Sequence, residues 1–167
     1  MMTYFIADTH FGDESIIRYE NRPFKDASEM DVFIMNQWNN TVSPEDVVFV
    51  LGDFTVYTDK VKIKQILDAL NGNKILVMGN HDRDFDANEW RECGFKECIP
   101  WPIVFKEYFI LSHEPLYINS NMPYANIFGH VHGNPAYKDA SKQSVCVSAE
   151  RINYTPVSFE ELVVAMK

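Results

Sequence analysis

All five histidines of this chain lie in short motifs that contain other groups able to bind a metal ion. Imidazole, carboxylate and one amide are together the ligand mix expected for two divalent cations that share a bridging carboxylate. The residue types therefore predict a metal site of this kind. The motifs, in chain order, are Asp8-Thr9-His10, Gly52-Asp53, Gly79-Asn80-His81-Asp82, Ser112-His113-Glu114 and Gly129-His130-Val131-His132.

The segments before these motifs look like β-strands. Residues 4–7, 47–51 and 75–78 are continuous apolar runs, a pattern typical of strands covered on both faces. Helices are predicted over residues 28–40, with Ser28 as N-cap, and over 58–70, where Asn71-Gly72 ends the helix. This β-α-β-α-β order predicts parallel strands with crossover helices, and ligands gather at the carboxyl ends of such strands.

The second half of the chain has a different pattern. Residues 103–105 and 108–111 predict a hairpin, and 126–128 and 145–147 predict two short strands. A capping box from Ser158 to Glu161 predicts a final helix over 158–166. Residues 11–25 are polar and poorly patterned, so we expect them to overhang the site and select the substrate. No repeat or linker is visible, and we expect one domain over residues 1–167.

Composition limits the partners. Fifteen Lys+Arg against 24 Asp+Glu give a net charge of −9, which disfavours extended nucleic acid but allows a small phosphorylated substrate. The absence of a signal pattern, of a run of about 20 apolar residues and of paired cysteines predicts a reduced, cytoplasmic protein without a membrane partner. The Cys93–Cys98 spacing does not fit a zinc knuckle, so we expect buried, inert thiols. Composition does not indicate an oligomeric state.

The order of the motifs, D-x-H, G-D, G-N-H-D, an isolated histidine and G-H-x-H, resembles the calcineurin-like metallophosphoesterase family over residues 8–132. The resemblance implies an α/β fold of the αββα sandwich type, with two mixed β-sheets flanked by helices. The β-α alternation alone supports an open doubly wound sheet equally well.

The resemblance also implies a role for each motif residue. Asn80 would both bind a metal and orient a phosphoryl oxygen, and His81 would protonate the leaving group as general acid. In-line attack by a metal-bound hydroxide would hydrolyse a phosphomonoester or a phosphodiester. The implied ligands are Asp8, His10 and His132 for the first metal, Asn80, His113 and His130 for the second, and Asp53 as the bridge.

The ligand types do not single out one metal. Mixed nitrogen and oxygen ligands suit Mn²⁺, which we place first, as well as Fe, Zn, Co or Ni. The lack of cysteine in the set disfavours a structural zinc site. Among the basic residues, Arg22 and Arg83 are the preferred pair for gripping a substrate phosphate, because they lie near the metal motifs.

One departure from better-known relatives changes the expected substrate. After Gly52-Asp53 the chain continues with Phe54-Thr55 rather than with the aspartate and arginine of serine/threonine protein phosphatases. This disfavours a phosphoprotein substrate and favours the small prokaryotic or phage-type members. Asp59 and Asp82 are the candidates to orient His81 in place of the missing carboxylate.

Other interpretations remain open. The chain could be a nuclease acting on DNA or RNA, although the superfamily's nucleases usually carry basic surfaces and added domains. It could also be a catalytically silent scaffold, although every ligand position is filled. Asp8 and Asp53 could each be a helix N-cap after a strand. Tyr19, Phe24 and Tyr57 could stack on a substrate ring, but ordinary packing is favoured.

Overall fold

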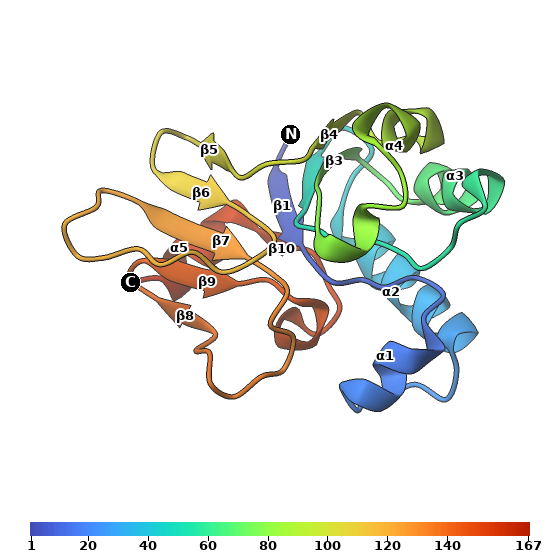
Figure 1. Cartoon of the computed structure of the whole chain (residues 1–167), viewed down its shortest axis with the longest axis horizontal. Coiled ribbons are helices and arrows are strands. Elements are labelled where there is room, and N and C mark those ends of the chain that lie inside the picture. The colour runs from blue at the N-terminus through green and yellow to red at the C-terminus, as the bar shows by residue number, and fades with distance from the viewer.

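Two β-sheets of mixed strand direction pack face to face (Figure 1). The computed structural model describes residues 1–167. The first sheet has the order β10-β1-β2-β3-β4, in which β10 is antiparallel to β1 and the other neighbours are parallel. Its strands are β1 (Thr3–Ile6), β2 (Val47–Val50), β3 (Asn73–Val77), β4 (Glu97–Ile99) and β10 (Val157–Ser158).

The second sheet has the order β5-β6-β7-β9-β8. Its three central strands, β6, β7 and β9, are parallel, and each edge strand is antiparallel to its neighbour. Two mixed sheets confirm the sandwich and exclude the single open sheet. The strands are β5 (Ile103–Phe105), β6 (Phe109–Leu111), β7 (Ala125–Phe128), β8 (Ala140–Ser141) and β9 (Ser144–Cys146).

Five α-helices flank the sheets, and four of them begin at an aspartate N-cap. The second helix begins at Ala27 because the Asp26 side chain accepts the Glu29 N–H, so the expected Ser28 cap is wrong. The capping box of Ser158 and Glu161 is confirmed. The helices are α1 (Glu14–Tyr19), α2 (Ala27–Thr41), α3 (Lys60–Ala69), α4 (Ala87–Cys93) and α5 (Phe159–Ala165), with 3-10 turns η1 (Asn80–Asp82) and η2 (Ala149–Ile152).

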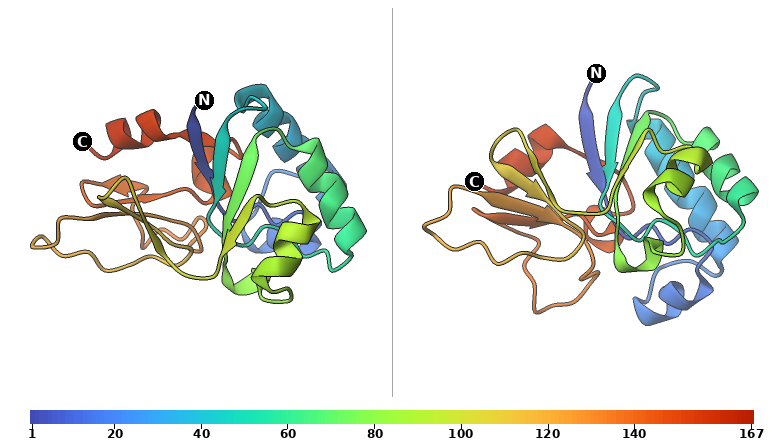
Figure 2. Two further views of the ribbon diagram at one scale, coloured as in Figure 1. Left: turned by 90° about the horizontal axis from the view of Figure 1, so that it is seen from above. Right: turned by 45° about the horizontal axis from the view of Figure 1, so that its top comes forward.

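The first sheet is covered on both faces, which explains its continuous apolar strands. Tyr4 and Ile6 join the cluster under α2, α3 and α4, whereas Phe5 joins the cluster between the two sheets. Helix α5 adds Leu162, and its C-cap residue adds Met166, to this second cluster, and the helix runs beside the sheets (Figure 2). The three cysteines are buried and free, as expected. No helix has the length and apolar character needed to cross a membrane.

The two sheets join at the end where the motifs lie. The Ala7 N–H donates to Val147 O at 2.9 Å, and the Ala149 N–H donates to Ala7 O at 3.0 Å. These bonds form a parallel bridge between Ala7 and Ser148, so β1 runs on beside β9 of the second sheet. The carboxyl ends of β1, β2, β3, β6 and β7 are thereby brought together at one edge.

Candidate metal centre

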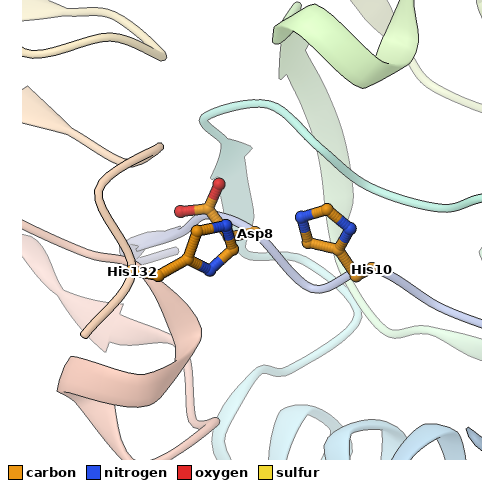
Figure 3. Close-up of side chains that lie close together, drawn as sticks. All are labelled: Asp8, His10 and His132. Atoms are coloured by element: carbon orange, nitrogen blue, oxygen red, sulfur yellow. The ribbon is translucent and has the colours of Figure 1, made fainter. Parts of the chain in front are cut away.

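The first group of ligand atoms comes from two different sheets. Asp8 and His10 follow β1, and His132 reaches them from the loop after β7 (Figure 3). One ligand atom from each of the three lies within 4.8 Å of the others. Asp8 Oδ1 and His10 Nε2 are buried and have no hydrogen-bond partner. Because buried polar atoms are costly when unpaired, this pocket fits a cation that would accept both lone pairs.

Carboxylates hold both imidazoles of this first pocket. His10 Nδ1 lies 3.2 Å from Asp13 Oδ2, and His132 Nδ1 lies 3.1 Å from Glu150 Oε1. With the proton on Nδ1, each ring keeps a lone pair on Nε2, which is the form that binds metals. The hydrogen bond from His10 lowers the pKa of Asp13 to about 2. Burial works to raise the pKa of Glu150, but His132 and Arg22 outweigh it and lower the pKa to about 2.

The second group of ligand atoms surrounds Nε2 of His113. This nitrogen lies 3.0 Å from Asn80 Oδ1, 3.3 Å from Asp53 Oδ2 and 3.1 Å from His130 Nδ1. His113 Nδ1 lies 2.8 Å from Leu51 O, a contact that requires the proton on Nδ1. A neutral His113 would then point an acceptor at two acceptor oxygens, so a cation or a second proton is needed here.

The charged groups around His113 shift one another's pKa values. Burial alone would lower the pKa of His113, but Asp53 and Asp8 raise it to about 9. Burial likewise works to raise the pKa of Asp53, but the hydrogen bond and charge of His113 lower it to about 2. For the fully buried Asp8, desolvation dominates and raises the pKa. In the absence of a cation, a proton on Nε2 of His113 therefore occupies the position in which a cation would fit.

Asp53 lies between the two pockets. Its Oδ2 is 3.7 Å from His10 Nε2 and 3.3 Å from His113 Nε2. Its Oδ1 is turned away and accepts the backbone N–H of His81 at 2.9 Å. A single carboxylate oxygen thus faces imidazoles of both groups, which is the placement that a bridging ligand requires.

The backbone at the site is in an unusual conformation. Positive φ angles between 45° and 68° occur at five of the expected ligands, namely Asp8, His10, Asp53, His130 and His132. A left-handed non-glycine residue costs roughly 1 kcal/mol or more, and such residues concentrate at functional sites. Hydrogen bonds across the loops hold them: Asp8 N–H donates to Gly52 O, and His10 N–H donates to Asp53 O. Neither Asp8 nor Asp53 caps a helix.

Two glycines allow the loops to come this close. A Cβ at Gly129 would clash with Ala7 Cβ and lie 2.8 Å from Asp8 Oδ2. A Cβ at Gly52, where φ is +86°, would clash with the His113 ring. The glycines of the motifs therefore make room for neighbouring ligand side chains rather than for a ligand molecule.

Arg22 is buried and supports the backbone and the carboxylate next to the first pocket. Its guanidinium donates to Asp8 O at 2.7 Å, to Thr9 O at 3.1 Å and to Glu150 Oε1 at 2.8 Å. Only 4% of Arg22 is exposed. These bonds occupy its donors, so the expected grip on a substrate phosphate does not fit Arg22, which instead fixes the loop of Asp8. Residues 11–25 likewise do not simply overhang the site, because Ile16 and Ile17 of α1 are buried in the core.

Glu150 and Arg151 of η2 are positioning residues. Sequence analysis missed Glu150 and considered Arg151 only as one of the basic residues that could bind phosphate. Glu150 contacts His132 and Arg22, while Arg151 donates through Nε to His132 O and through Nη2 to Asn134 O at 2.7 Å. Their only sequence signal is their place just after a strand, in the edge position where the other motifs occur. η2 therefore fixes both the side chain and the backbone of one expected ligand.

The loop after β3 is held by Asp82 rather than by a metal contact. The buried Asp82 carboxylate accepts the N–H groups of Gly79, Asp53 and Phe54 at 2.7–3.0 Å. His81 is exposed, and its ring centroid lies 5.4 Å from that of His10. Asp59 caps α3. Neither expected carboxylate contacts the His81 side chain, and Arg83 lies exposed on the same loop.

Comparison with known proteins places this arrangement in a family. The profile of the calcineurin-like phosphoesterases matches residues 1–160. The chain belongs to this family. A calcineurin-like phosphoesterase is expected to bind divalent metals, and the groups of ligand atoms described above are candidate places for them.

Relatives of this calcineurin-like chain occur in archaea, bacteria and phages. The uncharacterized protein MJ1445 of Methanocaldococcus jannaschii is 35% identical over 96% of this chain and 88% of its own. The gene 66 protein of Mycobacterium phage L5 is 30% identical over 52% of this chain and 42% of its own. The crystal structure of AQ665, a protein of unknown function from Aquifex aeolicus, is 30% identical with a TM-score of 0.72, covering 96% of this chain and 97% of its own. The sandwich is thus shared by a solved structure.

Proposed function

We propose that this protein is a phosphoesterase that depends on two divalent cations and hydrolyses a phosphomonoester or phosphodiester. The observation that carries the proposal is the position of Asp53 Oδ2 between Nε2 of His10 and Nε2 of His113. One carboxylate shared by two imidazole-containing groups is what a two-metal hydrolase needs, whereas a structural site would need only one closed ligand set. The whole of residues 1–167 would act as one catalytic domain.

The residues would divide the work as follows. Asp8, His10 and His132 would hold one cation, Asn80, His113 and His130 would hold the other, and Asp53 would bind both. Two such cations, with Mn²⁺ as the first candidate, supply Lewis-acid activation of water and of the phosphoryl oxygens. The chain holds these groups in place before substrate arrives, through Asp13, Glu150 and Asp82. Asn80 adds an oxygen without adding charge, and its amide N–H group can donate to a phosphoryl oxygen.

His81 would act on the leaving group. Its imidazole is exposed, while its backbone N–H is fixed on Asp53 Oδ1 at 2.9 Å. This anchors the residue beside the bridging carboxylate but leaves the ring free to reach a substrate oxygen. Imidazole can donate a proton near neutral pH, so His81 suits the protonation of the departing alcohol.

Removal and return of the metal tests the proposal. Protein treated with EDTA should lose hydrolysis of bis(p-nitrophenyl) phosphate and p-nitrophenyl phosphate, and Mn²⁺ should restore it. His81→Ala should lower kcat by about 10²–10⁴-fold while bound metal, measured by atomic emission, stays unchanged. Asp84→Ala, an exposed neighbour on the same loop, is the matched control. Full activity in EDTA, or unchanged kcat in His81→Ala, would contradict the proposal.

A further inference from the structure

A hollow of about 280 Å³ lies beside the loop of the expected general acid. Its lining residues are Met78, Arg83, Pro100 and Trp101. Met78 and Arg83 stand on either side of the 79–82 segment that carries Asn80 and His81. The Met78 N–H donates to Ile99 O at 2.9 Å, which holds the segment of Pro100 and Trp101 against this loop. The hollow is therefore built partly from the catalytic loop itself.

Trp101 provides an open aromatic face. It is 72% exposed, whereas Trp38 and Trp90 are 0% and 2% exposed in the core. Trp101 follows β4 after one intervening residue, Pro100, and that strand pairs with β3. Its ring is thus set on a short segment next to the sheet rather than on a long loop. A rigid exposed tryptophan offers a large stacking surface at low entropic cost.

Arg83 provides an uncommitted cation. Unlike Arg22 and Arg151, its guanidinium forms no ion pair or hydrogen bond with the rest of the protein. It closes the 3-10 turn that begins at Asn80, and residues three apart in such a turn lie on the same side. Arg83 therefore lies on the same side of this turn as Asn80, while also lining the hollow.

We propose that this hollow binds a planar aromatic ring of the substrate, with the nucleobase of a mononucleotide as the matching chemistry. This rests on the proposed function, because the ring would belong to the ester whose phosphate lies at the metal centre. The ring would stack on Trp101, and Arg83 would bind the phosphate next to it. The volume is at the low end for ligand pockets, which suits one ring. The net charge of −9 disfavours a longer nucleic acid chain.

Binding of AMP and of ribose 5-phosphate tests the proposal, because the two carry the same phosphate and differ in the base. Affinities are measured by calorimetry in metal-free protein, where no turnover occurs, and again with Mn²⁺. AMP should bind about 5- to 150-fold more tightly than ribose 5-phosphate, the range expected for one stacked base. Because Trp101 is the one exposed tryptophan, AMP should also quench the fluorescence, and ribose 5-phosphate should not.

Variants assign the effect to the hollow. Trp101→Ala should remove the preference for AMP, and Trp101→Phe should keep part of it. Tyr117→Ala, which removes an aromatic residue that is 88% exposed elsewhere, should leave the preference unchanged. Arg83→Gln should weaken AMP and ribose 5-phosphate by the same factor, because it acts on the phosphate.

The outcomes separate this proposal from the proposed function. Equal affinity for AMP and ribose 5-phosphate, or an unchanged preference in Trp101→Ala, would overturn the aromatic subsite even if Mn²⁺ restores hydrolysis. A preserved preference in a protein without metal-dependent activity would overturn the proposed function and leave a nucleotide-binding hollow. Phenyl phosphate serves as a further ligand: weaker binding than AMP supports a nucleobase, and binding as tight as AMP overturns the assignment to a base.

Discussion

The two ligand groups differ in what holds their imidazoles. In the first, the carboxylates of Asp13 and Glu150 contact His10 and His132. In the second, the corresponding contact of His113 is to the neutral backbone oxygen of Leu51. A carboxylate partner makes an imidazole a more basic and more firmly oriented ligand than a carbonyl does. We therefore expect the first pocket to bind its cation more tightly.

Exposure follows the same division. His10 and Asp8 of the first group are 3% and 0% exposed. In the second group His113 is equally buried at 1%, but Asn80 and His130 are exposed residues. The first pocket also gains backbone support from Arg22, which donates to Asp8 O and Thr9 O. On the proposed function, we therefore expect a permanent cation in the first pocket and an exchangeable one in the second, where substrate would approach.

The largest expected effect comes from removing the group that both pockets share. Asp53→Ala should reduce bound metal from two ions to one or none and lower kcat by about 10³-fold or more, because two-metal catalysis needs both ions. Metal content by atomic emission and hydrolysis of bis(p-nitrophenyl) phosphate give the two readouts. The matched control is Asp68→Ala, whose carboxylate is 59% exposed and pairs only with Lys64.

The Asp53→Ala variant can also contradict the assignment of Asp53 as the shared ligand. Should Asp53→Ala keep two ions and normal kcat, Asp53 would not bridge the pockets. Should it keep one tightly bound ion, the first pocket would bind its cation without Asp53, and the difference in affinity between the two pockets would be larger than expected. Circular dichroism would verify folding, because the Asp53 side chain also accepts the backbone N–H of His81 and so helps to hold this loop.

A smaller and more selective effect is expected from the carboxylates behind the first pocket. Glu150→Gln and Asp13→Asn should each weaken the first cation by about 10- to 100-fold and leave the second unchanged. Isothermal calorimetry that resolves two binding events measures this. The physical reason is the loss of charge next to His132 or His10, while a hydrogen-bond acceptor remains.

Asp26→Asn is the matched control for Asp13→Asn. Both aspartates cap a helix, but only Asp13 also contacts a histidine. Loss of a cap charge alone should therefore leave metal affinity unchanged in Asp26→Asn. Equal weakening of both cations by Glu150→Gln would mean that η2 supports the whole site and would remove the distinction between the pockets.

Sequence patterns predicted the elements that local residue types specify and the motifs that follow the ends of parallel strands. The continuous apolar strands and the capping box at Ser158 follow from local rules, and the structure has them. The motif residues meet because parallel strands end at one edge. By contrast, β4, β8 and β10 are short and have weak periodicity, so no local pattern indicated them. Helix α4 was missed although Asp86 and Glu89 form a capping box at its start.

The supporting groups could not be predicted for a different reason. Glu150 lies 128 residues from Arg22, and their ion pair exists only once the two sheets are joined. Arg22 looked available for phosphate because burial cannot be seen in a polar stretch of sequence. Trp101 was missed because a lone tryptophan after a strand is more often part of a core. Tertiary packing decides these roles, and it leaves no local signal.

The smallest expected effect is proton release by the second pocket. The pKa of His113 is raised from 6.5 to about 9 in the metal-free protein, so at pH 7.5 the ring is protonated. A cation that takes Nε2 must displace this proton. Loading both pockets of the metal-free protein should therefore release about one proton from His113 at pH 7.5 and about half a proton at pH 9. Calorimetry in buffers of different ionisation enthalpy counts these protons.

The sign of the linked stability change gives a second check. Because the folded pKa of His113 lies above its unfolded value of 6.5, its contribution to stability is complete below pH 6.5 and is lost as pH rises through about 9. The metal-free protein should therefore lose thermal stability across this interval, and the metal-loaded protein should lose less. Proton release that does not change between pH 7.5 and 9 would show that the cation does not displace the proton of His113, and His113 would then not be a ligand of the second pocket.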